Sequence, residues 1–284
     1  MKETSANIRI VKGVPGGETS PATENFTVKR NILCPMRDGI TLAVDVLLPD
    51  GDGPFPVILE RTPYDKNMAN HAGAEDFAKR GFVVVLQDVR GRFNSDGNFD
   101  PYRQEHQDGF DTINWIAEQT WCDGNVGMIG GSYGGQTQWY AASHAPKVLK
   151  AIVPLESPPG NPFVNEPFVG GTMVMAMLEW NAFMARRSAD NLKFSSLLTE
   201  HKDYFDVLPV SSAAKASGTN CAWWENTWLD HPTLDDFWKS CGYEQFWPKM
   251  TVPALNVSGW WGLNFYGAPR NFVGMRDQGG TKEA

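Results

Sequence analysis

Short apolar runs alternate with helical patterns between residues 26 and 154. Two partly alternating segments, Phe26–Cys34 and Ile40–Leu48, flank the turn Arg37-Asp38-Gly39, which predicts an antiparallel hairpin. Four more short runs are expected to be strands: Pro56–Glu60, Phe82–Leu86, Val126–Ile129 and Ala151–Pro154. Helices are expected over Ala72–Arg80, about Glu105–Gln119 and Gly135–Ser143. Strands that alternate with helices at these lengths predict an α/β fold with a mostly parallel sheet and an antiparallel edge.

The pattern changes after residue 156, where strand-like runs stop. Met173–Met184 and a Trp-rich segment from Trp223 to Trp247 indicate packed helices, and Pro253–Gly259 then returns as a buried strand. We therefore expect three parts: a flexible lead-in over 1–25, a core formed by 26–156 and 249–284, and a helical cap inserted over 157–248. The tryptophans either form the core of this cap or line an aromatic pocket, and the first reading is favoured.

Composition excludes several classes of protein. The 284 residues include 25 Lys+Arg and 33 Asp+Glu, a net charge of −8, which argues against a nucleic-acid partner. No apolar run approaches the roughly 18 residues of a membrane span, and the N-terminus lacks a signal peptide, so we expect a cytoplasmic protein without a membrane partner. The four cysteines match no zinc or redox motif. We expect reduced thiols, with a Cys221–Cys241 disulfide as the alternative in an exported protein, and neither a metal nor a cofactor.

One motif carries chemistry. Gly130-Gly131-Ser132-Tyr133-Gly134 fits Gly-x-Ser-x-Gly, and it lies between a predicted strand and a predicted helix. A serine in such a tight turn is presented above the sheet, where the amides at the start of the helix can stabilise an oxyanion. A phosphate-binding loop or a plain turn is the alternative, but no phosphate-loop pattern is present here. The motif predicts that Ser132 is a nucleophile.

The segment from Trp121 to Gly135 that contains this motif resembles the cocaine esterase and X-Pro dipeptidyl-peptidase hydrolases, the CocE/NonD group. Three other segments carry the same resemblance: Met36–Leu42, Arg61–Tyr64 and Gln87–Gly97. The match is close over Asn31 to Pro154 and looser over Thr251 to Met275. The resemblance implies an α/β-hydrolase core in which Ser132 is acylated. It also implies an oxyanion site formed by the Tyr64 hydroxyl and the backbone N–H of Tyr133, although Tyr64 alone reads as a turn residue after Pro63.

The sequence departs from this family in its triad. The resemblance places the acid at Gly262, which has no side chain to orient an imidazole, and the nearest polar residues are Asn264 and Asp277. It places the base beyond Ala284, together with a C-terminal β-sandwich. The five histidines all precede Gly262 and are expected to be surface or cap residues: His71, His106, His144, His201 and His231. If one of them is the base after all, His201 or His231 in the cap is the best candidate.

Two functions follow from these observations. The first is a serine hydrolase that cleaves an acyl ester or a peptide amide through an acyl-Ser132 intermediate, with a small-molecule ester or a peptide as its partner. The second is a catalytically incomplete fragment or a non-enzymatic binding protein. With the base and the acid unassigned, we expect this chain to hydrolyse activated aryl esters slowly and to cleave no amide measurably, and a homo-oligomer is a possible assembly. Acidic residues are scattered between Asp88 and Asp111, but their spacing fits no metal-binding loop, and we expect them to form a solvent-exposed face. Asp88 is expected to hydrogen-bond to the backbone of a loop, together with Arg90 or Arg92.

Overall fold

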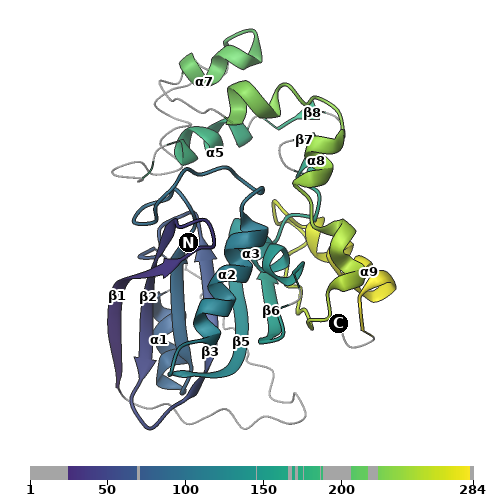
Figure 1. Cartoon of the computed structure of the whole chain (residues 1–284). Helices are drawn as coiled ribbons and strands as arrows, with labels where there is room; N and C mark the ends of the chain where they lie inside the picture. The colour runs from purple at the N-terminus through teal and green to yellow at the C-terminus, as the bar shows by residue number, and fades with distance from the viewer. Residues whose placement is uncertain are drawn as a thin grey trace, which may run out of the picture.

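The computed structural model describes residues 25–68, 71–144, 146–165, 168–169, 172–174, 176–185, 187, 206–216 and 223–281. Nearly all of the predicted lead-in therefore lies outside the described residues. The centre is a six-stranded sheet in the order β1-β2-β4-β3-β5-β6 (Figure 1). Its strands are β1 (Phe26–Pro35), β2 (Thr41–Pro49), β3 (Phe55–Thr62), β4 (Val83–Asp88), β5 (Cys122–Gly131) and β6 (Leu149–Leu155).

The direction of the strands confirms the α/β prediction. β1 pairs antiparallel with β2, and β2 pairs antiparallel with β4, whereas β4, β3, β5 and β6 run parallel. The turn between β1 and β2 includes Gly39, whose φ of 84° is a conformation that glycine adopts without steric cost. The N–H of Met36 donates to the carbonyl of Ile40 across this turn at 2.8 Å. The predicted hairpin is confirmed.

Alternation along β3 assigns the two faces of the sheet. Successive side chains of a strand point to opposite faces, so Val57, Leu59 and Arg61 share one face and Ile58 and Glu60 the other. Helices α2 (Glu105–Ala117) and α3 (Tyr133–Ala142) cover the first face, and α1 (His71–Lys79) packs on the second (Figure 1). All three predicted helices are present within about two residues of their expected ends. The sheet is therefore an inner layer between helices.

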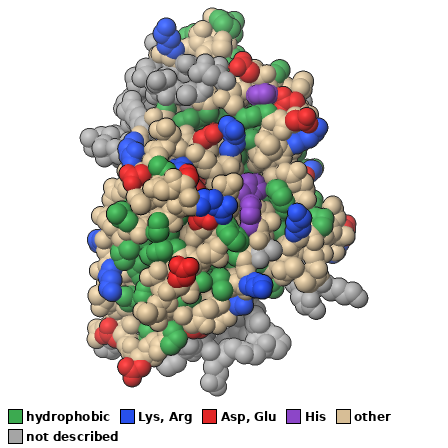
Figure 2. Space-filling model, in the orientation of Figure 1, with side chains coloured by type: hydrophobic (Ala, Val, Ile, Leu, Met, Phe, Trp, Pro, Cys, Tyr) green, Lys and Arg blue, Asp and Glu red, His purple; other side chains and the backbone are tan. Residues whose placement is uncertain are grey.

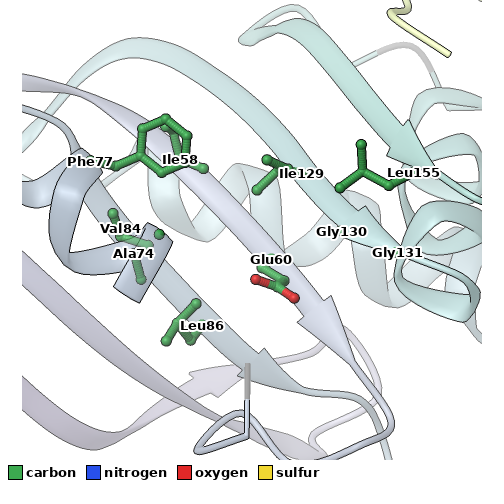
Figure 3. Close-up of a pocket in the computed structure, with 11 residues that line it drawn as sticks. Ile58, Glu60, Ala74, Phe77, Val84, Leu86, Ile129, Gly130, Gly131 and Leu155 are labelled. Atoms are coloured by element: carbon green, nitrogen blue, oxygen red, sulfur yellow. The ribbon is translucent and has the colours of Figure 1, made fainter. Parts of the chain in front are cut away.

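A cavity of about 130 Å³ opens on the α1 face of the sheet. Apolar side chains of α1 and of the strands line it, and Glu60 is the one carboxylate among its lining residues (Figure 3). Burial raises the pKa of Glu60 from 4.5 to about 7, because an ionised carboxylate loses hydration there. Glu60 therefore stays protonated to a higher pH than an exposed glutamate.

The late segment differs from its prediction. Residues 253–259 run beside β6, but only two isolated parallel bridges form, Ile152 with Ala254 and Leu155 with Val257. Leu255 is 64% exposed, so the expected buried strand is wrong. No described strand lies beyond this segment, so its outer edge pairs with no described backbone, and alternate side chains along it are exposed. Helix α9 (Gly267–Gln278) follows it.

The described residues between 157 and 248, here called the cap, are mostly short helices, and most of them lie over one end of the sheet (Figure 1). Its described elements are α4 (Pro162–Asn165), β7 (Phe168–Val169), β8 (Thr172–Met173), α5 (Ala176–Met184), the 3-10 turn η2 (Val210–Ser212), α7 (Ala213–Ala216), the π-helical η3 (Trp224–Trp228), α8 (Asp236–Ser240) and the 3-10 helix η4 (Glu244–Lys249). The short β7–β8 pair corrects the expectation that strands stop here. Trp224 and Trp228 are buried, which favours the core reading of the tryptophans.

Candidate active site

The turn between β5 and α3 holds Ser132 in a strained conformation. Its φ of 54° and ψ of −121° lie outside the regions that non-glycine residues ordinarily adopt. Its N–H donates to the carbonyl of Leu155 on β6 at 2.9 Å, which fixes the turn to the neighbouring strand. Gly130 has a φ of 153°, and a Cβ there would lie 2.9 Å from the carbonyl oxygen of Gly134. The glycines of the motif are thus required by the close passage of strand and helix.

Two backbone features make this turn chemically usable. Ser132 is the N-cap of α3, yet its side chain makes no capping hydrogen bond, so its hydroxyl is not engaged by the helix it precedes. The N–H of Tyr133 is the first of the helix and has no intrahelical acceptor. No hydrogen bond from it is found within the described part of the chain. A free N–H at a helix N-terminus beside a serine hydroxyl is the arrangement that stabilises a developing oxyanion.

The Tyr133 side chain is fixed by buried hydrogen bonds. Its hydroxyl donates to Glu105 Oε1 at 3.2 Å and accepts from the N–H of Tyr102 at 2.9 Å. Glu105 forms a buried ion pair with Arg61 at 2.9 Å. Burial raises the pKa of Glu105 while Arg61 lowers it, and burial, with the nearby Glu105 carboxyl, raises the pKa of Tyr133 well above its usual value. Tyr133 therefore stays a neutral phenol that holds the start of α3 in place.

These contacts correct the expectation of a solvated acidic face. Asp88, Glu105 and Asp108 are all buried. Asp108 pairs with Arg90 at 2.6 Å, and Asp88 accepts from the backbone N–H and the ammonium of Lys66. Asp88 thus bonds loop backbone as predicted, but its cationic partner is lysine and not an arginine. Buried carboxylates persist here because each has a cation or a donor to replace water.

Tyr64 lies in the loop after β3 and is half-buried. Its hydroxyl accepts a hydrogen bond from Trp180 Nε1 on α5 at 3.2 Å. Arg92 holds the same loop, because its Nε donates to the carbonyl of Pro63 at 2.9 Å. A second Arg92 nitrogen donates to the carbonyl of Met184 at 2.8 Å, at the end of α5. The loop that carries Tyr64 is therefore tied to the cap.

Trp180 also brings the two predicted oxyanion residues into one cluster. Its indole stacks on the Tyr133 ring with 6.0 Å between ring centroids, while its Nε1 contacts the Tyr64 hydroxyl. Trp228 stacks on Trp180, and Phe99 packs against both Tyr133 and Trp180. The sequence analysis did not single out Trp180, because a lone tryptophan in a helical pattern gives no signal beyond core packing. We call this cluster the aromatic wall, and it packs on the side chain of Tyr133, the residue after Ser132.

The histidines do not complete a triad in the described structure. His106 is buried and hydrogen-bonds Ser143 at the far end of α3, and His144 lies beside it. Ser143 is eleven residues beyond Ser132, or about 16 Å along a helix. His231 contacts Asp235 and stacks on Phe237. The side chain of His71 and the whole of His201 lie outside the part of the chain that the structure describes.

The two polar residues nearest to Gly262 in the sequence analysis make contacts of their own. Asp277 is exposed and pairs with the neighbouring Arg276 at 2.6 Å, and Asn264 is buried before α9. Cys34, Cys122 and Cys241 are free thiols, and Cys221 falls outside the described residues. In the part of the chain that the structure describes, no group of three or more His, Cys, Asp or Glu is arranged to hold a metal ion.

Charge and length add two observations. Acidic and basic side chains are interspersed on the face of the molecule that Figure 2 shows. Among the described helices, none combines the length and the apolar character needed to cross a membrane.

Comparison with known proteins shows the family. Residues 38–282 match the family described as X-Pro dipeptidyl-peptidase (S15 family). The cocaine esterase of Rhodococcus sp. (strain MB1 Bresler) is 36% identical over 273 residues, which cover 89% of this chain and 47% of that protein. The chain thus spans about half the length of the curated relative.

Solved structures agree with this assignment. An α-amino acid ester hydrolase superposes with a TM-score of 0.73 and 25% identity, over 96% of this chain and 49% of that one. A CocE/NonD family hydrolase from Staphylococcus aureus has the same fold, with a TM-score of 0.68 and 24% identity over 91% of this chain and 45% of that one. The predicted α/β-hydrolase core is confirmed. The chain belongs to the S15 family of X-Pro dipeptidyl-peptidases.

Proposed function

We propose that this chain carries the nucleophile and the oxyanion site of a serine hydrolase that cleaves an acyl ester or an X-Pro amide. The observation that carries the proposal is the strained backbone of Ser132 next to the unbonded N–H of Tyr133. The relatives support the reaction class, because those named above are called an esterase, an ester hydrolase and a dipeptidyl-peptidase. Strain at a serine between a strand and a helix has no structural benefit, so its presence favours a chemical role.

The reaction proceeds in two halves. Ser132 Oγ attacks the carbonyl carbon of the substrate and gives its proton to a general base, and the carbonyl oxygen becomes an oxyanion. The N–H of Tyr133 and the hydroxyl of Tyr64 donate hydrogen bonds to that oxyanion. Collapse of the intermediate breaks the bond to the alcohol or amine, which leaves with the proton, and water then cleaves acyl-Ser132. The general base is not assigned to any described histidine.

The aromatic wall favours substrates with an apolar acyl or side-chain group. Trp180 presents its ring to Tyr133, and its Nε1 hydrogen bond keeps the Tyr64 hydroxyl oriented. A phenol that is already held by one donor can rotate its own O–H towards a substrate without losing its position. Pre-oriented donors of this kind are the largest single contribution to acyl-transfer catalysis in many enzymes.

The test is active-site labelling. The unmodified chain and Ser132→Ala are incubated with a fluorophosphonate probe, and labelling is followed by intact mass. We expect one adduct on the unmodified chain and none on Ser132→Ala, with Ser240→Ala, at the exposed end of α8, as the matched control that keeps labelling. Equal labelling of the unmodified chain and Ser132→Ala would remove the nucleophile assignment and favour the non-enzymatic alternative. Hydrolysis of p-nitrophenyl acetate and of an X-Pro anilide then separates esterase from peptidase activity.

A further inference from the structure

Glu156 follows β6 at the level of the candidate nucleophile. Gly131 and Leu155 are paired in the parallel register of β5 and β6, so the residues that come next, Ser132 and Glu156, leave the sheet side by side. The carboxyl ends of neighbouring parallel strands are where active sites of open α/β sheets form. Glu156 also has a φ of 45°, a left-handed conformation that a glutamate adopts at a cost in energy.

The Glu156 carboxylate is held in one orientation by the late segment. Its Oε1 accepts from the N–H of Gly259 at 2.6 Å and from the hydroxyl of Ser258 at 3.0 Å. The backbone N–H of Glu156 donates to the carbonyl of Val257 at 2.7 Å, which fixes the same segment against β6. No described donor reaches the second oxygen, Oε2. One oxygen is therefore fully engaged and the other keeps its acceptor capacity.

The second oxygen fills the space beside Gly262. A Cβ added to Gly262 would lie 2.0 Å from Glu156 Oε2 and 2.5 Å from its Cδ, far inside van der Waals contact. Any side chain at position 262 would thus occupy the volume that the Glu156 carboxylate now fills. A side chain at 262 would have to displace the Glu156 carboxylate, which occupies the place where an acid at 262 would start.

We propose that Glu156 supplies the acid of the catalytic apparatus, from the end of β6 in place of position 262. The inference rests on the proposed function, because an acid is needed only if Ser132 is activated by an imidazole. A carboxylate in this role orients the imidazole and stabilises the imidazolium that forms when the serine proton is taken. Glu156 is therefore a positioning residue. Its Oε2, which accepts from no described donor, is the atom available to an imidazole.

A purely structural role makes a different prediction. If Glu156 only holds the 258–259 turn, then glutamine should replace it, since the amide oxygen still accepts from Gly259 and Ser258. If its charge matters, Glu156→Gln should fold normally and lose activity. Replacement of the triad aspartate by asparagine in a serine protease lowers kcat by about 10⁴. Glu118→Gln, at an exposed position after α2, is the matched control.

The assay measures the rate at which a fluorophosphonate labels Ser132, with imidazole added to the buffer as the base, across pH 6–9. Relative to the unmodified chain, we expect Glu156→Gln to slow the imidazole-dependent labelling at least about tenfold, well within the loss seen for a triad acid, and Glu118→Gln to have no effect. Far-UV circular dichroism and thermal melting show that both variants are folded.

A second experiment moves the carboxylate from position 156 to position 262 and tests whether labelling of Ser132 recovers. Gly262→Asp alone places two carboxylates in one volume and is expected to slow labelling. Glu156→Ala/Gly262→Asp moves the single carboxylate to position 262, and it should recover most of the rate lost in Glu156→Ala. Gly262 has no left-handed φ, so its backbone accepts an aspartate.

The outcomes separate the two proposals. Labelling of Ser132 that is slowed in Glu156→Gln and recovered in the double variant supports the assignment. An unchanged rate in Glu156→Gln overturns it and leaves Ser132 as the nucleophile. A loss that the double variant does not recover assigns Glu156 to the 258–259 turn, which also overturns it. If Ser132→Ala labels as fast as the unmodified chain, the proposed function itself fails, and the inference fails with it.

Discussion

Replacing Glu60 by glutamine is expected to stabilise the protein above pH 7 and to change little near pH 4.5. Glu60 lies in the cavity between α1 and the sheet, among apolar side chains (Figure 3). Its pKa rises from 4.5 to about 7 on folding, because burial disfavours the charged form. Glutamine has nearly the same shape, so the substitution removes the charge without opening a larger cavity.

The magnitude follows from linkage between folding and proton binding. Between pH 4.5 and 7 the folded state binds more protons at Glu60 than the unfolded state, so stability falls as pH rises through this window. The difference of about 2.5 pKa units, at about 1.4 kcal/mol each, amounts to at most about 3.5 kcal/mol once pH exceeds 7. Glu60 is only half-buried, and we therefore expect a gain of about 2–3 kcal/mol for Glu60→Gln at pH 8.

Urea denaturation followed by tryptophan fluorescence at pH 4.5, 6 and 8 measures this gain. The free energies of unfolding of the variant and the unmodified protein must be compared at the same pH, because His106 changes stability with pH in the opposite direction to Glu60. Burial lowers the pKa of His106 from 6.5 to about 4, so its contribution to stability increases as pH rises over that range. That contribution is common to both proteins and cancels. A difference in unfolding free energy that is the same at pH 4.5 and pH 8 would refute the reasoning, and Glu118→Gln provides the exposed control.

Two further substitutions test the site and its surroundings. Tyr64→Phe should lower ester hydrolysis by about 10²–10³ through loss of one oxyanion donor, with an unchanged circular dichroism spectrum; an unchanged rate would make Tyr64 a turn residue only. Gly267→Ala should destabilise the chain by about 1–3 kcal/mol or more, since tight cores tolerate extra methyl groups poorly, and here the new Cβ would lie 1.8 Å from the carbonyl oxygen of Ser157. Gly127→Ala is its control in thermal melting, because the nearest atom to that Cβ is 3.7 Å away; equal melting temperatures for the two variants would contradict the packing argument.

The sequence determined the elements that depend on neighbouring residues. The strand at the apolar run Phe82–Leu86, the turn at Gly39 and the three helices that flank the sheet were all predicted from periodicity and turn chemistry, and the structure confirms them. The strained turn at Ser132 was predicted in the same way, because the small residues around it are required by the close passage of β5 and α3. Each of these signals is contained within a short stretch of chain.

Predictions that depended on distant partners were less successful. The acidic residues before and within α2 were expected to be solvated, yet Glu105 is buried against Arg61, 44 residues earlier in the chain. Charge alone predicts exposure, and only the packing of α2 on β3 brings the compensating cation. The segment 253–259 reads as a buried strand from its composition, but burial needs a covering element, and no described element covers it.

The candidate site also contains residues that the local sequence revealed and residues that only tertiary contacts revealed. Ser132 could be found from a five-residue motif, whereas the contact of Trp180 with Tyr64 joins residues 116 positions apart. From the sequence, Gly262 indicated only that the expected acidic side chain is missing at this position. The tertiary structure shows what fills its place, because β6 delivers the Glu156 carboxylate to the same volume from 106 positions earlier in the chain. Local patterning decides which elements form, and the docking of those elements decides which side chains share a site.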